Sequence, residues 1–479
     1  MVIGKPESFF GRESEWESLA GFVESDGGAK LGLVYGRRRQ GKTLLLQTLC
    51  ESYAGFYWQA LEQSSAQNLS GFSAAWSTFV SSSTPIRFVS WLEALRAVFS
   101  ETTTQARPIV IDEVGYLIDS APDFPSILQS VLTPLAVQRS KARLILCGSS
   151  FGQMRRLVEA QAPLRGRANL IVVVRPFSYR QAADFWGLGN NLDAAFCLHA
   201  LVGGTPAYRN LASELPVRGD VRKWAIRQLL DARSPLFREG HVVVSEDTAL
   251  TDRAMYWSVL AGLIDGNARR RDLALALDRP ETSLSHSLDV LTEAGWVERV
   301  VDPLHGRRSR YVVTEPIVRV WRLLVEPHAA RLEAGGPAQA VRVWDDAEPT
   351  IASRIYGPHL EQLASEWLLL HADPTMLGGQ VDMVGSSEVR LPGGTAQVDL
   401  VATSVGASGK RQTLVIGEVK ATRRPVGPGE LDRLDEIATA VAPTAKRLLV
   451  SRGGFTAPLR KAAALRPDVI LADLTTLYT

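Results

Sequence analysis

One stretch, LVYGRRRQGKTLLLQTL at residues 33–49, constrains the fold more than any other part of the chain. Residues 36–43 read G-R-R-R-Q-G-K-T, which fits the phosphate-binding pattern G-x-x-x-x-G-K-[ST]. The pattern needs a strand before it and a helix after it. KLGLVY upstream is short and apolar, and TLLLQTLCESY downstream has the apolar spacing of a helix. An ordinary glycine turn is the alternative, and both flanks argue against it.

Each fixed position of this loop has a chemical task. Gly36 and Gly41 let backbone N–H groups converge on phosphate at the N-terminus of the following helix, where Leu44 is also expected to bind the cofactor. Lys42 is expected to reach the β- and γ-phosphates, and the hydroxyl of Thr43 to hold Mg²⁺. The loop therefore predicts ATP and magnesium as cofactors.

Three arginines, Arg37, Arg38 and Arg39, fill the interior of the loop. In a phosphate loop the backbone N–H groups face the ligand and the side chains between the glycines point away from it. Arginine there is compatible with phosphate binding and adds positive potential. Solvent, another domain, another subunit and DNA all remain open as the surroundings of these guanidinium groups.

Two further strands end in polar residues. RPIVIDEVGYL places Asp112 near Mg²⁺ and gives Glu113 the task of orienting or activating the attacking water, unless these are a buried strand and a capping acid. ARLILCGSS ends in Ser149 and Ser150, which can touch the γ-phosphate or the water, or serve only as turn residues. Strands alternating with helices predict a parallel sheet, and ligands bind at the carboxyl ends of its strands.

Six stretches together resemble, in order and spacing, the ATPases first grouped as archaeal ATPases, on the STAND and AAA+ side of the P-loop class. They are FFGRESEWESL, GRRRQGKTLLL, IVIDEVGYL, LILCGSSFGQM, PLRGRANLIVVVRPFSYRQA and LVGGTPAYRN. The resemblance covers about residues 8–215. It implies that Phe10, Gly11 and Arg12 lie near the nucleotide base.

The same resemblance implies roles for residues outside the phosphate loop. Thr205 and Pro206 would lie in a small helical lid beside the nucleotide. Arg167 would sense the γ-phosphate, either in the same chain or from a neighbouring subunit, with a solvated loop arginine as the equal alternative. A homo-oligomer is thereby left open.

Composition sets bounds on the whole chain. With 479 residues, 46% hydrophobic and 22% charged, an ordinary globular protein of about three domains is expected. The net charge of +2 means that any basic surface must be local. Cys50, Cys147 and Cys197 lack metal-like spacing and are expected to be reduced packing residues. No secretory signal pattern or membrane-spanning apolar run occurs, which favours the cytoplasm and no membrane partner.

Residues 250–325 predict three helices followed by a β-hairpin, which is the order of a winged helix-turn-helix. The expected recognition helix, PETSLSHSLDVLTEAG, contains no lysine or arginine. Basic residues lie instead on the hairpin and before the second helix: Arg307, Arg308 and Arg310, and Arg269, Arg270 and Arg271. This pattern indicates binding to the DNA backbone with weak base reading, or a module that only packs against other parts of the protein.

The C-terminal third follows EAGGPAQA at 333–340, which reads as a linker. A helix, the strand VRLPGGTAQVDLVATSV, the turn GASGK, the strand QTLVIGEVKAT, a helix and two more strands are expected. Asp399 ends the first strand run, and Glu418 and Lys420 point to one face of the second. Two carboxylates beside a lysine can hold Mg²⁺ and place a water for attack on a phosphodiester.

This C-terminal segment resembles the PD-(D/E)XK nuclease fold, in the domain often fused to these ATPases. The resemblance makes Glu361, in HLEQL, the helical glutamate of the metal site beside Asp399 and Glu418, with Glu366 as a weaker candidate. Lys420 would be catalytic. A nuclease-like fold kept only for binding, with an inert acid cluster, is the alternative.

The expected fold is α/β with four parts. They are a P-loop parallel-sheet ATPase core at 1–180, a helical lid at 181–245, a winged helix-turn-helix at 246–332 and an α/β restriction-endonuclease-like domain at 341–479. The expected function is ATP hydrolysis coupled to a nucleic-acid-binding, Mg²⁺-dependent nuclease-like domain. The alternatives are a signalling or regulatory ATPase whose C-terminal domain binds DNA or protein without cleaving, and an ATP-dependent transcriptional regulator.

Overall fold

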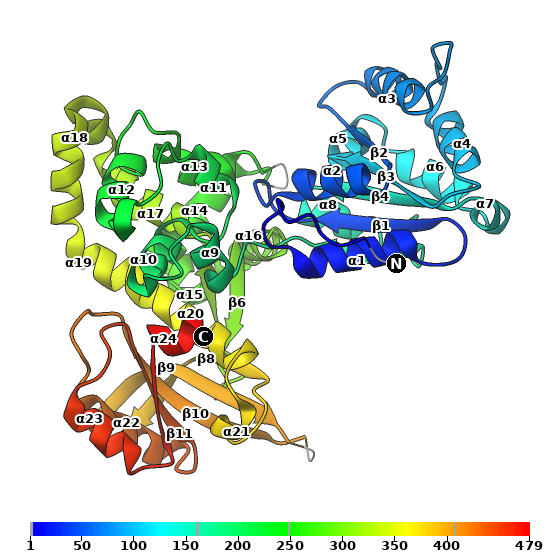
Figure 1. Cartoon of the computed structure of the whole chain (residues 1–479). Coiled ribbons are helices and arrows are strands. Elements are labelled where there is room, and N and C mark those ends of the chain that lie inside the picture. Colours follow the sequence, from blue (N-terminus) through cyan, green and yellow to red (C-terminus); the bar gives the residue numbers. More distant parts are fainter. Residues whose placement is uncertain (1–2, 160–161, 248–249, 407–408) are drawn as a thin grey trace.

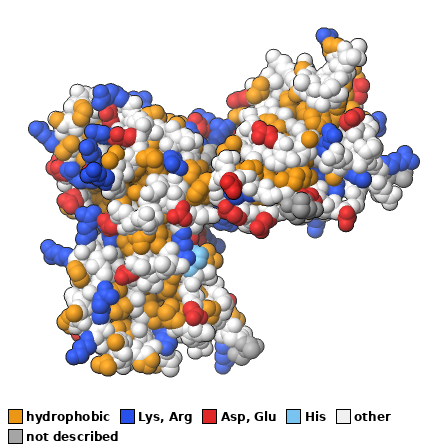
Figure 2. Space-filling view, in the orientation of Figure 1, with side chains coloured by type: hydrophobic (Ala, Val, Ile, Leu, Met, Phe, Trp, Pro, Cys, Tyr) orange, Lys and Arg blue, Asp and Glu red, His pale blue; other side chains and the backbone are white. Residues whose placement is uncertain are grey.

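The computed structural model describes residues 3–159, 162–247, 250–406 and 409–479. Figure 1 shows an α/β region at the N-terminus, a group of helices joined to it, and a second α/β region at the C-terminus. Across these described ranges, no helix is both long enough and apolar enough to cross a membrane. Lys and Arg side chains are interspersed with Asp and Glu on the face shown in Figure 2, in keeping with the net charge of +2.

The N-terminal sheet has five parallel strands in the order β2-β3-β4-β1-β5. Its central strands are mostly apolar and are buried along nearly their whole length, because helices cover both faces. The strands are β1 (Lys30–Tyr35), β2 (Phe56–Gln59), β3 (Arg107–Asp112), β4 (Ala142–Gly148) and β5 (Ala168–Val173).

Two sets of helices enclose this sheet. One core lies under α1 (Glu13–Glu24) and α2 (Lys42–Ser52). The other lies under α3 (Ser65–Phe79), α4 (Trp91–Glu101), α5 (Val114–Ser120) and α6 (Phe124–Val131). The short helices α7 (Pro134–Arg139) and α8 (Phe151–Arg156) flank β4. The predicted parallel α/β core is therefore confirmed.

A helical region, called here the lid region, follows at residues 179–245. The capping box of Ser178 and Gln181 begins its first helix, because each side chain pairs with the other residue's backbone N–H. Its elements are α9 (Tyr179–Phe185), α10 (Leu192–Val202), α11 (Ala207–Leu211), η1 (Val217–Gly219), α12 (Val221–Gln228), η2 (Pro235–Phe237) and α13 (Glu239–Ser245).

The next unit, called here the hairpin module, has three helices and a two-stranded antiparallel hairpin. Its elements are α14 (Arg253–Ile264), α15 (Arg270–Ala276), α16 (Glu281–Glu293), β6 (Val297–Val301) and β7 (Ser309–Val313). A run of helical segments leads from it to the C-terminal sheet: α17 (Pro316–Val320), η3 (Trp321–Val325), η4 (Glu326–His328), α18 (Ala329–Asp346), α19 (Glu348–Thr350), η5 (Ile351–Tyr356) and α20 (Gly357–Leu370).

The predicted linker at 333–340 is wrong, because these residues lie inside α18. The helix contains a kink at Gly336, whose φ of 61° suits glycine, and Pro337 begins the second half. Buried apolar residues on both sides of the kink, Leu332 and Ala340, hold the two halves against the core.

The C-terminal domain contains a mixed five-stranded sheet in the order β12-β11-β10-β9-β8. β8, β9 and β10 are antiparallel, whereas β10, β11 and β12 are parallel. Its elements are α21 (Pro374–Leu377), β8 (Met383–Leu391), β9 (Gly394–Val405), β10 (Arg411–Lys420), α22 (Pro428–Val441), β11 (Lys446–Ser451), α23 (Ala457–Ala464), β12 (Val469–Asp473) and α24 (Leu474–Tyr478).

The first strand expected in this domain is two strands. The sequence VRLPGGTAQVDLVATSV turns back on itself at Pro392 and Gly393, so that Leu391 pairs with Gly394 across a tight hairpin. Proline and glycine favour such a turn, and the strand interpretation overlooked them. Asp399 consequently lies in the middle of β9, not at its end.

The cores divide the chain into two packed bodies. One hydrophobic core runs from Tyr179 to Leu477 and joins the lid region, the hairpin module, α20 and one face of the C-terminal sheet. The other face of that sheet packs against α22 and α23. We call residues 3–175 the N-terminal body and residues 179–479 the C-terminal body. Figure 1 shows the two meeting over a limited region beside α8 and α16.

Candidate functional site

The carboxyl ends of three neighbouring strands bring the predicted nucleotide residues together. β4 pairs in parallel with β1 on one side and with β3 on the other. The loop after β1, the acids after β3 and the serines after β4 therefore meet at one edge of the sheet.

The phosphate loop closes on itself. Gly41 has a φ of 82° at the N-terminus of α2, which suits glycine. Gly36 lies so close to β5 that a Cβ there would be 2.1 Å from the carbonyl oxygen of Val174. The Nζ of Lys42 donates to the carbonyl oxygens of Gly36 at 2.7 Å and Arg37 at 2.9 Å. The lysine is thus held over the loop, where a phosphate would be its partner.

Thr43 and Asp112 lie side by side, as the sequence predicted for a magnesium site. The Oγ1 of Thr43 donates to Oδ2 of Asp112 at 2.8 Å, and the backbone N–H of Glu113 donates to Oδ1 at 2.8 Å. A hydroxyl and a carboxylate are the hard oxygen ligands that Mg²⁺ prefers, so these residues fit the ion. The hydroxyl of Tyr57 also donates to Oδ2 of Asp112, at 2.7 Å. No sequence signal pointed to Tyr57, which belongs to a strand without a recognisable motif.

The two serines after β4 have different partners. The Oγ of Ser149 donates to Oε2 of Glu113 at 2.9 Å, whereas the Oγ of Ser150 caps α8 by accepting from the backbone N–H of Gln153. Glu113 adopts a left-handed φ of 48°, which turns its side chain out of the strand direction. Ser149 therefore touches the expected base, and Ser150 is a helix cap.

Arg12 joins the end of the phosphate loop to the segment after β5. Its guanidinium donates to the carbonyl oxygens of Gln40 at 2.9 Å and Arg175 at 2.6 Å, and lies 4.5 Å from the centre of the Phe177 ring. Burial lowers the pKa of Arg12. Gly11 packs so closely on Phe177 that a Cβ would be 2.9 Å from the ring. Proximity to the nucleotide base stays a prediction.

The lid region contacts the loop through Gln40. Its Nε2 donates to Oγ1 of Thr205 at 3.1 Å. Pro206 follows at the N-terminus of α11. A change in the shape of the phosphate loop would therefore alter this contact with the lid region.

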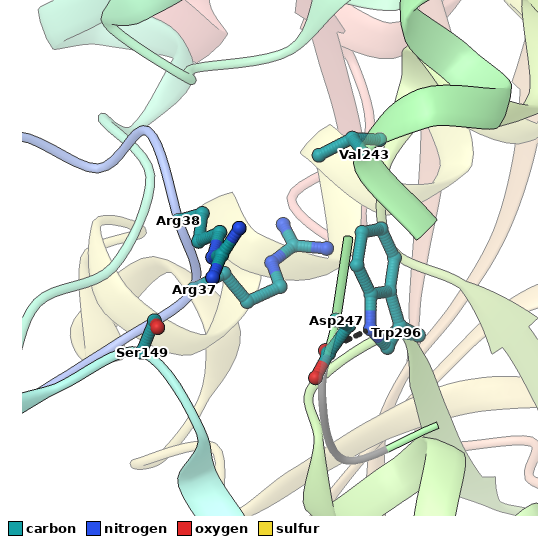
Figure 3. A pocket seen from close by; sticks show the side chains of 6 residues that line it. All are labelled: Arg37, Arg38, Ser149, Val243, Asp247 and Trp296. Atoms are coloured by element: carbon teal, nitrogen blue, oxygen red, sulfur yellow. Dashed lines mark hydrogen bonds between the residues drawn. The ribbon is translucent and has the colours of Figure 1, made fainter. Parts of the chain in front are cut away.

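Arg37 crosses from the phosphate loop to the C-terminal body. It forms an ion pair with Glu315, and both side chains are buried. The guanidinium lies 4.7 Å from the centre of the Trp296 ring. Burial raises the pKa of Glu315, although Arg37 opposes that shift. Figure 3 shows Arg37, Arg38 and Ser149 facing Trp296 and Asp247 across a small pocket, with Trp296 donating to Asp247 at 2.7 Å.

The other two loop arginines also have defined partners. Arg39 pairs with Glu239 at 3.0 Å and with Glu246 at 2.8 Å, both on or just after α13. Arg38 donates to the hydroxyl of Tyr116 at 2.6 Å. Burial raises the pKa of Glu239 to about 7. Of the surroundings left open by the sequence, another domain is the one observed for Arg37 and Arg39.

Arg167 is not at the nucleotide site of its own chain. It precedes β5 and donates to the carbonyl oxygen of Leu132, at the edge of the sheet opposite the phosphate loop. A strand rises about 3.3 Å per residue, so the residue before β5 and the residue after it lie at opposite edges of the sheet. Sensing of the γ-phosphate in the same chain is therefore contradicted, and a contact from a neighbouring subunit stays a prediction.

The C-terminal acids gather around the middle of β9 and the end of β10. The Nζ of Lys420 lies 2.8 Å from Oε1 of Glu418 and 3.2 Å from Oε2 of Glu430. The backbone N–H of Val419 donates to Oδ2 of Asp399 at 3.0 Å. Burial and repulsion from Glu418 raise the pKa of Asp399 to about 6.

Glu361 on α20 belongs to the same electrostatic neighbourhood. Burial, and then repulsion from Asp399, raise its pKa to about 7, while Arg310 and Arg319 lower it. Glu366 is set apart, because its charged neighbours are Arg180 and Glu298. In the part of the chain that the structure describes, no three Asp, Glu, His or Cys side chains are arranged to hold a metal ion.

Comparisons with known proteins agree with the N-terminal site. Residues 9–207 match a family described as an ATPase domain predominantly from Archaea. An uncharacterized protein of Methanocaldococcus jannaschii is 23% identical over 332 residues, which are 68% of this chain and 71% of that protein.

Two solved structures are similar at low identity. A Walker-type ATPase of Pyrococcus abyssi is 19% identical, with a TM-score of 0.53 over 67% of this chain and 98% of its own. The ORC2 protein of Aeropyrum pernix is 14% identical, with a TM-score of 0.44 over 72% of this chain and 98% of its own. The first of these shows a shared fold. The match to an ATPase domain, together with the geometry of the phosphate loop, shows that the chain is an ATPase of the P-loop class.

Proposed function

We propose that ATP bound and hydrolysed at the N-terminal site controls a nucleic-acid-binding, Mg²⁺-dependent nuclease in the C-terminal domain. The observation that carries this proposal is the acid cluster. Asp399, Glu418 and Lys420 come together on adjacent strands, and Glu361 is close enough that repulsion from Asp399 and Glu418 adds to the burial that raises its pKa. Mg²⁺ often binds through only one or two carboxylates and keeps several waters, so two acids are sufficient ligands.

At the ATP site the proposal gives each side chain one task. Lys42 binds the phosphates, Thr43 and Asp112 hold Mg²⁺, and Glu113 orients the water. Magnesium there would neutralise developing charge on the phosphates. Ser149 keeps the carboxylate of Glu113 at the sheet edge through its hydrogen bond.

The contacts between the two bodies support the coupling. Arg37 and Arg39 join the phosphate loop to Glu315 and Glu239 of the C-terminal body. Within that body the C-terminal domain is held to the lid region. Two contacts between them are an ion pair of Arg452 with Asp193 at 2.5 Å and a hydrogen bond from the hydroxyl of Tyr179 to the carbonyl oxygen of Leu477 at 2.6 Å. A shift of the lid region would therefore move the acid cluster with it.

We further propose that the hairpin module is a winged helix that guides nucleic acid to the acid cluster. The module lies against β8 through two contacts: Arg269, just before α15, pairs with Glu388 at 2.5 Å, and Ser387 donates a hydrogen bond to Asp302 in the hairpin loop. Arg307 and Arg308 remain exposed at its tip. Since α16 carries no lysine or arginine, backbone contact is better supported than base reading, which disfavours the sequence-specific regulator.

The test is a cleavage assay on single- and double-stranded DNA and RNA, with Mg²⁺ or Mn²⁺ and with or without ATP. Asp399→Asn, Glu418→Gln and Lys420→Met should each abolish cleavage and keep ATP hydrolysis, because the acids belong to a separate domain. Glu436→Gln is the matched control, since Glu436 is exposed on the neighbouring helix α22.

A parent protein that cleaves no substrate under either metal would contradict the nuclease proposal. The second candidate, an ATPase whose C-terminal domain binds nucleic acid or protein without cleaving, would then lead. One observation favours it: Lys420 is already bound by both Glu418 and Glu430. Binding of nucleic acid or protein that persists when Asp399 and Glu418 are both replaced would distinguish the second candidate from the first.

A further inference from the structure

Asp112 receives an unusual set of hydrogen bonds for the carboxylate of a nucleotide site. Its Oδ2 accepts from two hydroxyls, those of Thr43 at 2.8 Å and Tyr57 at 2.7 Å. Its Oδ1 accepts from the backbone N–H of Glu113 at 2.8 Å. The side chain is completely buried. Both oxygens are thus fixed, and the plane of the carboxylate with them.

The strand alternation explains how Tyr57 reaches this position. Phe56 and Trp58 pack in the core under α3 to α6, so Tyr57 between them faces the opposite side, toward α2. β2 pairs with β3 so that Tyr57 lies beside Val110, two residues before Asp112. The phenol therefore extends along the sheet to its carboxyl edge, between the end of β3 and the start of α2.

We propose that Tyr57 is a positioning residue for the magnesium site, acting through Asp112. The hydroxyl of Thr43 has two tasks, because its oxygen would bind the ion while its O–H still donates to Asp112. The phenol of Tyr57 has only the second task. It holds Oδ2 in place independently of Thr43.

The consequence follows from what magnesium requires. Mg²⁺ demands near-ideal octahedral geometry, and partners that orient its ligands commonly matter by about 10- to 100-fold in metal affinity. Phenylalanine at position 57 would keep the ring and remove the donor. Asp112 would then rotate more freely, and the ion would bind less well, whereas the phosphate contacts of Lys42 and the loop N–H groups would be unchanged.

The experiment separates metal binding from nucleotide binding. The affinity for a fluorescent ADP analogue is measured in excess EDTA and again over a Mg²⁺ titration, alongside the Mg²⁺ dependence of ATP hydrolysis. Tyr57→Phe should keep the EDTA affinity within about twofold and raise the Mg²⁺ concentration for half-maximal effect by roughly tenfold or more. An unchanged Mg²⁺ requirement, or an equal loss of affinity in EDTA, would overturn the proposal.

Two further variants complete the design. Tyr53→Phe is the matched control. Tyr53 follows the C-terminal end of α2, whereas Thr43 lies in its first turn, and the hydroxyl of Tyr53 donates at 2.6 Å to Glu24. Its loss should not change the Mg²⁺ requirement. The inference rests on Asp112 being a magnesium-site carboxylate, which Asp112→Asn tests separately by raising the Mg²⁺ requirement alone. In that background Tyr57→Phe should add little; a full additional effect would mean that Tyr57 does not act through Asp112.

Discussion

Arg37 in the phosphate loop and Glu315, 278 positions later, form a buried ion pair between the two bodies of the molecule. A buried charge is costly unless its partner is in place, so such a pair defines the relative position of the elements that carry it. The loop that is expected to wrap the phosphates therefore also fixes the segment after the hairpin. Arg37, together with Arg39, joins the phosphate loop to the C-terminal body.

Removing one partner of this pair should be strongly destabilising. Glu315→Gln would leave the Arg37 guanidinium buried without a counter-charge, which we expect to lower the free energy of unfolding by about 3–5 kcal/mol. Urea unfolding measures the change. Arg222→Gln is the control, because the Arg222–Asp345 pair is 53% and 55% exposed, and we expect it to cost less than about 1 kcal/mol. An equal loss of unfolding free energy in the two variants would show that the buried pair contributes no more to stability than the exposed pair.

Binding and hydrolysis should separate at the N-terminal site. Lys42→Ala removes the cation above the loop and should weaken ATP binding and hydrolysis together. Glu113→Gln should keep ATP affinity and lose hydrolysis, because a carboxamide is a poor base for water. Equilibrium binding and phosphate release measure the two effects. Hydrolysis by Glu113→Gln at the parent rate would exclude Glu113 as the base.

The junction should also make stability depend on pH. Burial raises the pKa of Glu239 from 4.5 to about 7. The folded state then binds a proton at Glu239 more tightly than the unfolded state, so the contribution of Glu239 to stability is fully present below pH 4.5 and is lost as the pH rises through about 7.

Glu239→Gln cannot ionise and should make that fall shallower without removing it, since Asp399 and Glu361 also have raised pKa values. Urea unfolding across this pH range is the measurement. Glu436→Gln, which removes an exposed carboxylate of α22, should retain the slope of the parent. A slope that Glu239→Gln leaves unchanged would mean that Glu239 titrates normally.

The sequence predicted the nucleotide site because its parts follow from local rules. The contact of Thr43 with Asp112 could be expected, since both follow apolar strands of one parallel sheet. The same rule could have excluded a role for Arg167 at the nucleotide site of its own chain, because Arg167 precedes the strand ANLIVV and so lies at the opposite edge.

Other features had no local signal. The partners of Arg37 and Arg39 come from segments about 200 to 280 positions away, and no spacing rule connects them. The two glycines before Pro337 suggested a linker, but apolar residues on both sides supply enough buried surface to keep a kinked helix. Local composition favoured a linker, whereas tertiary packing keeps these residues in a helix.

The tip of the hairpin gives the sharpest test for nucleic acid. Arg307 and Arg308 are exposed there, and the hairpin itself is held against β8 by the hydrogen bond that Ser387 donates to Asp302. If both guanidiniums contact phosphates, each releases counterions on binding, and the double variant Arg307→Ala/Arg308→Ala should lower the slope of log affinity against log salt by up to about two units. Fluorescence anisotropy with a DNA duplex over a salt series gives this slope. Arg222→Ala, which removes an exposed arginine from the lid region, should leave it unchanged. An unchanged slope in the double variant would make the hairpin module a packing unit, whereas an equal drop in both variants would indicate only a general effect of net charge.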